Sequence, residues 1–185
     1  PPDQGNKLGA IESIQEVIAN ATITGAALHV VHISSVGLSV TEDLLEIVEK
    51  ASLNGLDITT ECYPYAAGMT LIESAIFDDG WQGNLGVNYE DLLWPSTGEV
   101  LNKSSFEKYR AEGGMVVVNF IPETSVIASV KSSLTSIATD GWLKDSKGHP
   151  RTSGSYAKIL GEFVRQKKAI TLMDAIRKSS LMPAQ

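Results

Sequence analysis

A histidine and an aspartate stand where two apolar runs give way to polar residues. Residues 26–33 are strongly apolar and contain His29 and His32, and residues 134–139 are followed directly by Asp140. His29 and His32 are three apart, so on an extended strand they face opposite sides and at most one can reach a shared site. His32 is nearer the following loop and is the better candidate. An imidazole nitrogen can bind a divalent metal, and a carboxylate can bind metal or move protons.

Each of these two residues also has an ordinary structural explanation. A single histidine on a strand is often a hydrogen-bonded core residue. An aspartate followed by glycine often forms a turn. The pattern leaves both interpretations open.

Arg151 is a third candidate, within the polar stretch 148–154. A guanidinium group can bind a carboxylate through two parallel hydrogen bonds, although a surface arginine in a loop is the alternative.

Glu61 and Cys62 are adjacent, but strand alternation sends them to opposite faces, and a buried structural thiol is the simpler explanation of Cys62. Asn119 follows another apolar run and is a weak candidate by itself.

Several common catalytic motifs are absent from the sequence. It contains no P-loop, no GxGxxG, no GxSxG and no HExxH. Phosphate-binding, dinucleotide-binding, serine-hydrolase and zincin functions therefore lack support.

The composition is that of a globular protein with an acidic charge balance. The chain has 185 residues, 43% hydrophobic and 20% charged, with a formal net charge of −7 and no basic run, which argues against nucleic-acid binding. Residues 21–40 carry no Asp, Glu, Lys or Arg, but their histidines, serines and glycines make a poor membrane span. The single cysteine cannot form an internal disulfide, and no signal-peptide pattern is visible. We expect a cytoplasmic protein without a membrane or nucleic-acid partner.

Helix-type and strand-type patterns alternate along the chain. Helices are expected at residues 11–21, 41–54, 106–112, 123–130 and 156–166, and from Thr171, where Asp174 is placed to complete a cap. Strands are expected at residues 26–33, 56–61, 115–120 and 134–139. Residues 66–102 are rich in Gly, Asp, Asn and Trp and are expected to be irregular; such a segment is more often functional than idle, with disorder as the alternative.

This alternation predicts an α/β fold with a parallel sheet. Four strand–helix units suit half of an eight-stranded (β/α)8 barrel, and they also suit a small doubly wound sheet; periodicity cannot decide between them. In either case the carboxyl ends of the strands meet at one edge. His32, Tyr65, Asn119 and Asp140 are therefore predicted to lie at the same edge.

Four stretches, in order, resemble the amidohydrolase superfamily, specifically its D-aminoacylase (N-acyl-D-amino-acid deacylase) branch. They are His-Ile-Ser-Ser at 32–35, Tyr-Pro-Tyr-Ala-Ala-Gly at 63–68, Ala-Thr-Asp-Gly at 138–141, and residues 148–185, from Gly-His-Pro-Arg to Leu-Met-Pro-Ala-Gln. The last block is the most specific, because it includes the spacing from Asp140 to Arg151 and the helix Ile-Leu-Gly-Glu-Phe-Val-Arg. The resemblance implies a single domain, residues 1–185, that forms strands five to eight of a TIM-type barrel with their helices and carries an irregular insertion at about 66–102.

The resemblance also implies a metal-dependent hydrolase of carbon–nitrogen bonds, acting on N-acyl amino acids with one or two divalent ions, zinc being expected. In such a site His32 is the metal ligand of the fifth strand. Asp140, on the eighth strand, is the catalytic carboxylate that takes a proton from metal-activated water and passes it to the leaving amine. Arg151 binds the α-carboxylate of the substrate, with Tyr65 and His149 as further substrate-binding residues.

Two alternatives stay open. Related cyclic amidases have a histidine near the position of Tyr65, and His-Ile-Ser-Ser is more like dihydroorotase and hydantoinase sequences, so a cyclic-amide hydrolase is one alternative. A non-catalytic half-barrel that binds or interacts is the other. The His-x-His and the fourth-strand ligand of the family would lie upstream of this chain. We therefore expect a fragment that is inactive alone, binds zinc weakly or not at all, and self-associates through open barrel edges.

Overall fold

The computed structural model describes residues 3–143 and 148–184. Pro1, Pro2, residues 144–147 and Gln185, which the predicted single domain also included, lie outside the described residues. The assignment of 1–185 to one domain stays a prediction.

The N-terminal part alternates helix and strand as predicted. Helix α1 (Asp3–Thr24) leads to β1 (Leu28–Val30), to the short helices α2 (Ile33–Gly37) and η1 (Leu38–Val40), and then to α3 (Thr41–Leu53) and β2 (Ile58–Cys62). Helix α3 is amphipathic, because Leu44, Leu45 and Val48 lie on one face and are buried. Its acidic first turn and the lysine in its last turn suit the helix dipole.

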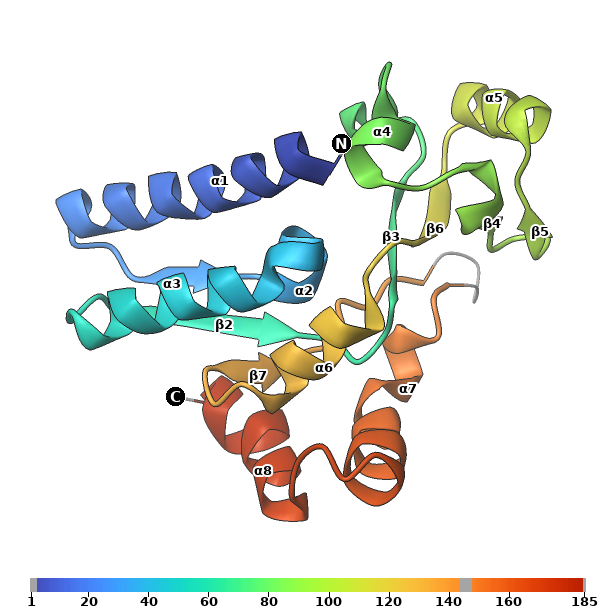
Figure 1. The fold of residues 1–185 in the computed structure, drawn as a ribbon. Helices are drawn as coiled ribbons and strands as arrows, with labels where there is room; N and C mark the ends of the chain where they lie inside the picture. Colours follow the sequence, from blue (N-terminus) through green and yellow to red (C-terminus); the bar gives the residue numbers. More distant parts are fainter. Residues whose placement is uncertain (1–2, 144–147, 185) are drawn as a thin grey trace.

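Strands β1, β2 and β7 (Thr135–Ile137) form a three-stranded parallel sheet in that order. Val30 pairs with Thr60, and Cys62 pairs with Ile137, so the strands run toward one common carboxyl edge. Helices α1 and α3 run alongside this sheet (Figure 1). In the part of the chain that is described, β1 and β7 each pair only with β2, so the sheet is open and does not close into a barrel.

The prediction that residues 115–120 form a third strand of this parallel sheet is wrong. Strand β6 (Met115–Asn119) belongs to a second, antiparallel sheet of order β3-β6-β4-β5. Its partners are β3 (Ala67–Leu71) and β4 (Leu92–Trp94), and β5 (Glu99–Val100) pairs with β4. Strands β3, β4 and β5 all come from the segment predicted to be irregular. The cause is the shared signature of buried strands: Val116, Val117 and Val118 are all buried, and a continuous apolar run does not indicate which strand it pairs with.

An aromatic cluster fixes this second sheet. Trp81, in α4 (Trp81–Leu85), stacks on Phe106, in α5 (Lys103–Glu112), with ring centroids 5.2 Å apart. Trp94 stacks on Tyr109 at 4.2 Å. Gly114 lets the chain enter β6 beside Trp94, because a Cβ there would lie 2.8 Å from the indole. The segment 66–102 is therefore an ordered subdomain, which includes the short helices η2 (Ala75–Phe77) and η3 (Tyr89–Asp91).

The remaining helices come before and after β7 in the chain, and the first and the last two of them contact that strand (Figure 1). They are α6 (Glu123–Lys131), α7 (Arg151–Lys158), its wider continuation η4 (Ile159–Gln166), α8 (Leu172–Ile176), η5 (Arg177–Leu181) and η6 (Met182–Ala184). The predicted cap is confirmed: Thr171 accepts the Asp174 backbone N–H, and Asp174 reciprocates. The helix predicted at 156–166 begins earlier, at Arg151, so the stretch that looked like a loop is the first turn of α7.

One face of the parallel sheet is polar and partly exposed. His29 contacts Thr59 Oγ1 at 2.7 Å and Glu61 at 3.5 Å across neighbouring strands. The strand predicted at 26–33 ends at Val30, so His32 lies beyond it; His29 and His32 do face different surroundings, but strand alternation is not the cause. No helix within residues 3–143 and 148–184 is both long enough and apolar enough to span a membrane.

Candidate active site

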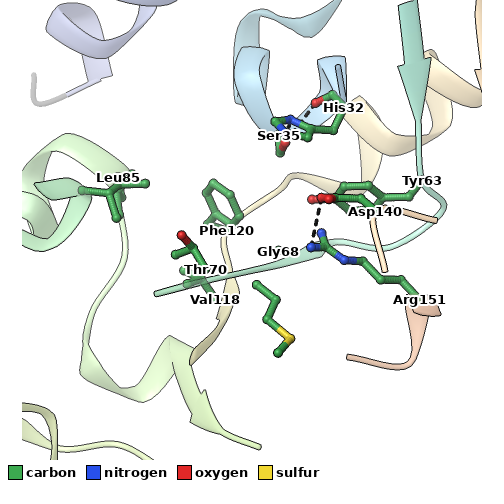
Figure 2. Close-up of a pocket in the computed structure, with 12 residues that line it drawn as sticks. His32, Ser35, Tyr63, Gly68, Thr70, Leu85, Val118, Phe120, Asp140 and Arg151 are labelled. Atoms are coloured by element: carbon green, nitrogen blue, oxygen red, sulfur yellow. Dashed lines mark hydrogen bonds and ion pairs between the residues drawn. The ribbon is translucent and has the colours of Figure 1, made fainter. Parts of the chain in front are cut away.

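A cavity of about 220 Å³ lies between the carboxyl edge of the parallel sheet and the antiparallel sheet (Figure 2). Its polar side comes from the loops and helices that follow β1, β2 and β7. Its apolar side comes from the subdomain that the sequence did not predict. The lining residues are His32, Ser35, Tyr63, Asp140 and Arg151 on the polar side, and Gly68, Met69, Thr70, Ile76, Leu85, Val118 and Phe120 on the other.

His32 reaches the cavity through an unusual backbone conformation. It lies two residues beyond β1 with φ 33° and ψ 56°, in the left-handed region that is costly for a side-chain-bearing residue. Its Nδ1 lies 2.8 Å from Ser35 Oγ. The Ser35 hydroxyl donates to the His32 carbonyl at 2.9 Å, which leaves an Oγ lone pair that can accept a hydrogen bond from Nδ1–H. A proton on Nδ1 is compatible with both contacts and would give Nε2 the lone pair that binds a ligand.

Asp140 reaches the same cavity from β7, and its backbone is also left-handed, with φ 45°. Its carboxylate lies 3.0 Å from the terminal nitrogen of Arg151, and 38% of its side chain is exposed. The prediction that His32 and Asp140 lie at the same edge is confirmed, because both line one cavity. Left-handed residues concentrate at functional sites when surrounding structure holds them in place.

Arg151 is the most buried charged group of the cavity. Its side chain is 3% exposed, and its guanidinium lies over the ring of Tyr63 at 4.5 Å from the centroid. Its Nε has no hydrogen-bond partner in the described part of the chain. Arg151 also lines the cavity, and a guanidinium group at such a place is suited to receive an anionic group.

Tyr63 joins the two halves of the polar side, and the sequence prediction missed this role. It is 1% exposed, it hydrogen-bonds Ser35, and its ring carries the Arg151 guanidinium. Burial raises the pKa of the Tyr63 hydroxyl, while the nearby Arg151 charge opposes that rise. Both Tyr63 and Ser35 lie inside the stretches that carry the family resemblance, and this position in the sequence could have identified them as site residues.

Tyr65 and His149, predicted to bind substrate, do not line the cavity. They pack against each other with ring centroids 5.2 Å apart, next to the start of α7. Burial, together with the Arg151 and Lys158 charges, lowers the pKa of His149 to about 4. His149 is thus neutral at physiological pH.

The remaining candidates lie elsewhere. The prediction that Asn119 and Asp140 share an edge is wrong, because Asn119 ends β6 and its amide donates to Asp91 O at 3.3 Å in the antiparallel sheet. Glu61 faces His29 on the polar sheet face. Cys62 is fully buried, and burial raises the pKa of its thiol to about 12, which opposes the thiolate that metal binding needs.

Comparison with known proteins gives this geometry a context. No family model matches the chain. The N-acyl-D-glutamate deacylase of Alcaligenes xylosoxydans xylosoxydans is 24% identical over 190 residues, which cover 97% of this chain and 39% of that protein. The D-aminoacylase of the same organism is 22% identical over 155 residues, which cover 77% of this chain and 30% of that protein.

Solved structures share the fold. A D-aminoacylase crystal structure, described as defining a novel subset of amidohydrolases, has a TM-score of 0.74 and 18% identity over 94% of this chain. The N-acyl-D-glutamate deacylase of Bordetella bronchiseptica, in complex with zinc and a phosphonate inhibitor, has a TM-score of 0.74 and 21% identity over 92% of this chain. The resemblance to the D-aminoacylase branch of the amidohydrolases is confirmed.

This D-aminoacylase-like chain spans 39% of the length of the deacylase from Alcaligenes and 38% of each of the two solved chains. A binuclear metal centre has been described for D-aminoacylase. In this chain, His32 and Asp140 are cavity-lining residues whose side chains have atoms of the kind that can bind a divalent metal. Across residues 3–143 and 148–184 no group of three His, Cys, Asp or Glu side chains is placed to hold an ion. The residues present thus fit part of a zinc site, since a catalytic zinc usually takes three protein ligands and a water.

Proposed function

We propose that this chain is part of a metal-dependent hydrolase that cleaves the amide bond of N-acyl amino acids. The observation that carries the proposal is the convergence of His32, Asp140 and Arg151 on one cavity. An imidazole, a carboxylate and a guanidinium are the groups that amide hydrolysis of a carboxylate-bearing substrate needs. The names of the curated relatives support the same substrate class.

Each residue would have a separate task. His32 would hold a divalent ion through Nε2, with Ser35 fixing the tautomer. The ion, when bound, would supply an acidified water and polarise the scissile carbonyl. Asp140 would take a proton from the attacking water and give it to the leaving nitrogen. Arg151 would bind the α-carboxylate of the substrate, because its guanidinium lines the cavity and has five N–H donors, more than the contact with Asp140 uses.

The apolar wall of the cavity suits an uncharged portion of the substrate. Leu85, Val118 and Phe120 come from the antiparallel subdomain and lie across the cavity from the polar residues (Figure 2), and Met69 of the same subdomain also lines the cavity. Gly68 keeps this wall compact, since a Cβ there would lie 2.8 Å from the Phe120 ring. A small apolar acyl group or side chain would bury surface here.

The activity would belong to a longer protein. Two donors do not complete a catalytic zinc site. We propose that the missing ligands, and the strands that close the open parallel sheet into a barrel, come from chain outside these 185 residues. The chain alone would hydrolyse nothing measurable, and its open strand edges would favour self-association.

The test is hydrolysis by the full-length protein that contains this chain, purified with zinc. N-acetyl-D-amino acids with apolar and acidic side chains are compared with dihydroorotate and hydantoin. We expect turnover of the N-acyl amino acids. Turnover of the cyclic amides alone would replace the proposal with the cyclic-amidase alternative, and no turnover of either class would leave the non-catalytic alternative.

Asp140→Asn provides the residue-level test, with Asp57→Asn as its matched control. Asp57 is exposed and precedes β2, at the end of the sheet opposite the cavity. Because general acid–base groups contribute about 10²-fold or more, Asp140→Asn is expected to lower kcat by that factor while substrate still binds. Asp57→Asn should keep the wild-type kcat. Equal kcat for both variants would contradict the role of Asp140.

A further inference from the structure

His149 makes a hydrogen bond that a helix cap normally makes. The Arg151 backbone N–H donates to His149 Nδ1 at 3.0 Å. The spacing of two residues is that of an Asx turn, in which a side-chain oxygen accepts the N–H two positions on. Here an imidazole nitrogen takes the place of that oxygen. Because Nδ1 must accept, His149 is neutral and carries its proton on Nε2.

The imidazole is held in this position from the side. His149 is 5% exposed, and Tyr65 meets it edge-on at 5.2 Å. The Tyr65 hydroxyl donates to the Pro150 carbonyl at 3.5 Å, a long contact that adds less than the ring packing. Lys158, on the helix α7 that Arg151 begins, places its Nζ 4.4 Å from the centroid of the Tyr65 ring.

Gly154 completes the arrangement. A Cβ at this position would lie 2.5 Å from the Tyr65 hydroxyl, so only glycine lets Tyr65 approach α7 this closely. The hydrogen bonds of Tyr65 and His149 thus go to the backbone of Pro150 and Arg151, and neither side chain lines the cavity.

We propose that His149 and Tyr65 are positioning residues: His149 caps α7 at Arg151, and Tyr65 holds the imidazole in its capping orientation. Together they fix the guanidinium over Tyr63 and against Asp140. This assignment rests on the proposed role of Arg151, and it differs from direct substrate contact because it acts through the Arg151 backbone. Arg151 is the first residue of α7, so a frayed first turn displaces its side chain directly.

Substitutions at His149 separate capping from substrate contact. His149→Asn supplies an Oδ1 that can accept the same N–H, whereas His149→Ala removes the acceptor. In the full-length protein we expect His149→Ala to raise KM for an N-acyl amino acid about five- to tenfold, the size of a lost cap. His149→Asn should stay near wild type. The corresponding N-acyl amino acid amide, which has no α-carboxylate, should respond little to either change.

Two readouts do not depend on activity. Nitrogen-15 NMR should report the Nε2–H tautomer of His149, and hydrogen exchange at the Arg151 amide should accelerate in His149→Ala and in Gly154→Ala but not in His149→Asn. Thermal unfolding identifies any variant that fails to fold. Equal damage from His149→Ala and His149→Asn, for both substrates, would overturn the proposal in favour of direct contact. If Arg151→Ala leaves KM unchanged while exchange follows the pattern above, the cap stands and the substrate role of Arg151 fails.

Discussion

Asp140 and Arg151 form an ion pair of 3.0 Å in which the arginine is buried and the aspartate remains partly exposed. The aspartate engages one terminal nitrogen, and the Nε of the guanidinium has no partner among the described residues. A guanidinium has five N–H donors, so one cation can contact Asp140 and still receive a second carboxylate. This pairing places the proposed proton carrier and the proposed substrate anchor side by side.

Arg151→Ala is expected to raise KM, whereas the loss of the Asp140 carboxylate is expected to lower kcat. Removing a charge-assisted pair from a partly desolvated site costs on the order of 2–5 kcal/mol, so KM for N-acyl amino acids should rise steeply. The matching amides should be affected much less, because they lack the α-carboxylate. Steady-state kinetics on both substrates with the full-length protein makes the measurement. A loss of equal size on acid and amide would show that Arg151 is structural.

Zinc should bind weakly to the 185-residue chain. His32 and Asp140 line the cavity without a third ligand among the described residues, and a catalytic zinc usually needs three. Metal analysis of the purified chain after dialysis against zinc should give well under one equivalent, and His32→Ala should lower that value further. If a full equivalent of zinc stays tightly bound in His32→Ala, the ion binds at another site. His29 and Glu61 would then be the first residues to substitute.

Lys168→Gly should stabilise the chain. Lys168 has φ 51°, in the left-handed region. The next amide, Ala169 N–H, donates back to Phe163 O at 2.8 Å, and this hydrogen bond closes a left-handed C-cap. Glycine adopts this conformation without the strain of about 1 kcal/mol that other residues carry. The midpoint of thermal unfolding should rise by a few degrees, since about 1 kcal/mol corresponds to roughly 2–4 °C at this size. Lys168→Ala is the control, because it removes the side chain but keeps the strain. An equal gain in both variants would assign the effect to charge.

Stability should fall in mildly acidic solution because of His149. Its pKa is about 4 in the folded chain against an ordinary value of 6.5, with burial as the main cause and the Arg151 and Lys158 charges adding to it. The unfolded chain therefore binds the proton more readily. The stability that neutral His149 contributes is complete above the unfolded pKa and is lost as the pH falls from 6.5 towards 4. The free energy of unfolding, measured with denaturant at several pH values in this window, should fall less steeply with decreasing pH for His149→Asn than for wild type. Identical slopes would assign the acid sensitivity to other groups.

The sequence alone predicted those features that depend on residues close together in the chain, such as the buried face of a helix or a helix cap. The face of α3 follows from the spacing of Leu44 and Val48, and the start of α8 follows from Thr171 and Asp174. The parallel direction of β1, β2 and β7, and the presence of His32 and Asp140 at one edge, followed from the alternation of strands and helices and from residue type, whereas the direct pairing of β2 with β7 did not. In these cases the determining groups are within a few residues of one another, or repeat along the chain.

Only the tertiary structure decided which strand pairs with which. The valines of β6 would suit a buried strand in either sheet. Their partners β3 and β4 have five and three residues, and no period of hydrophobicity marks either strand. The burial of Arg151, its ion pair with Asp140, and the joining of Ser35 to Tyr63 likewise depend on chain segments far apart in sequence. Tyr65 and His149 show the same limit, because the sequence placed both near the site, whereas the direction in which each side chain points depends on packing against α7. Contacts of this kind arise when separate surfaces are brought together, so a residue's type and neighbours do not specify them.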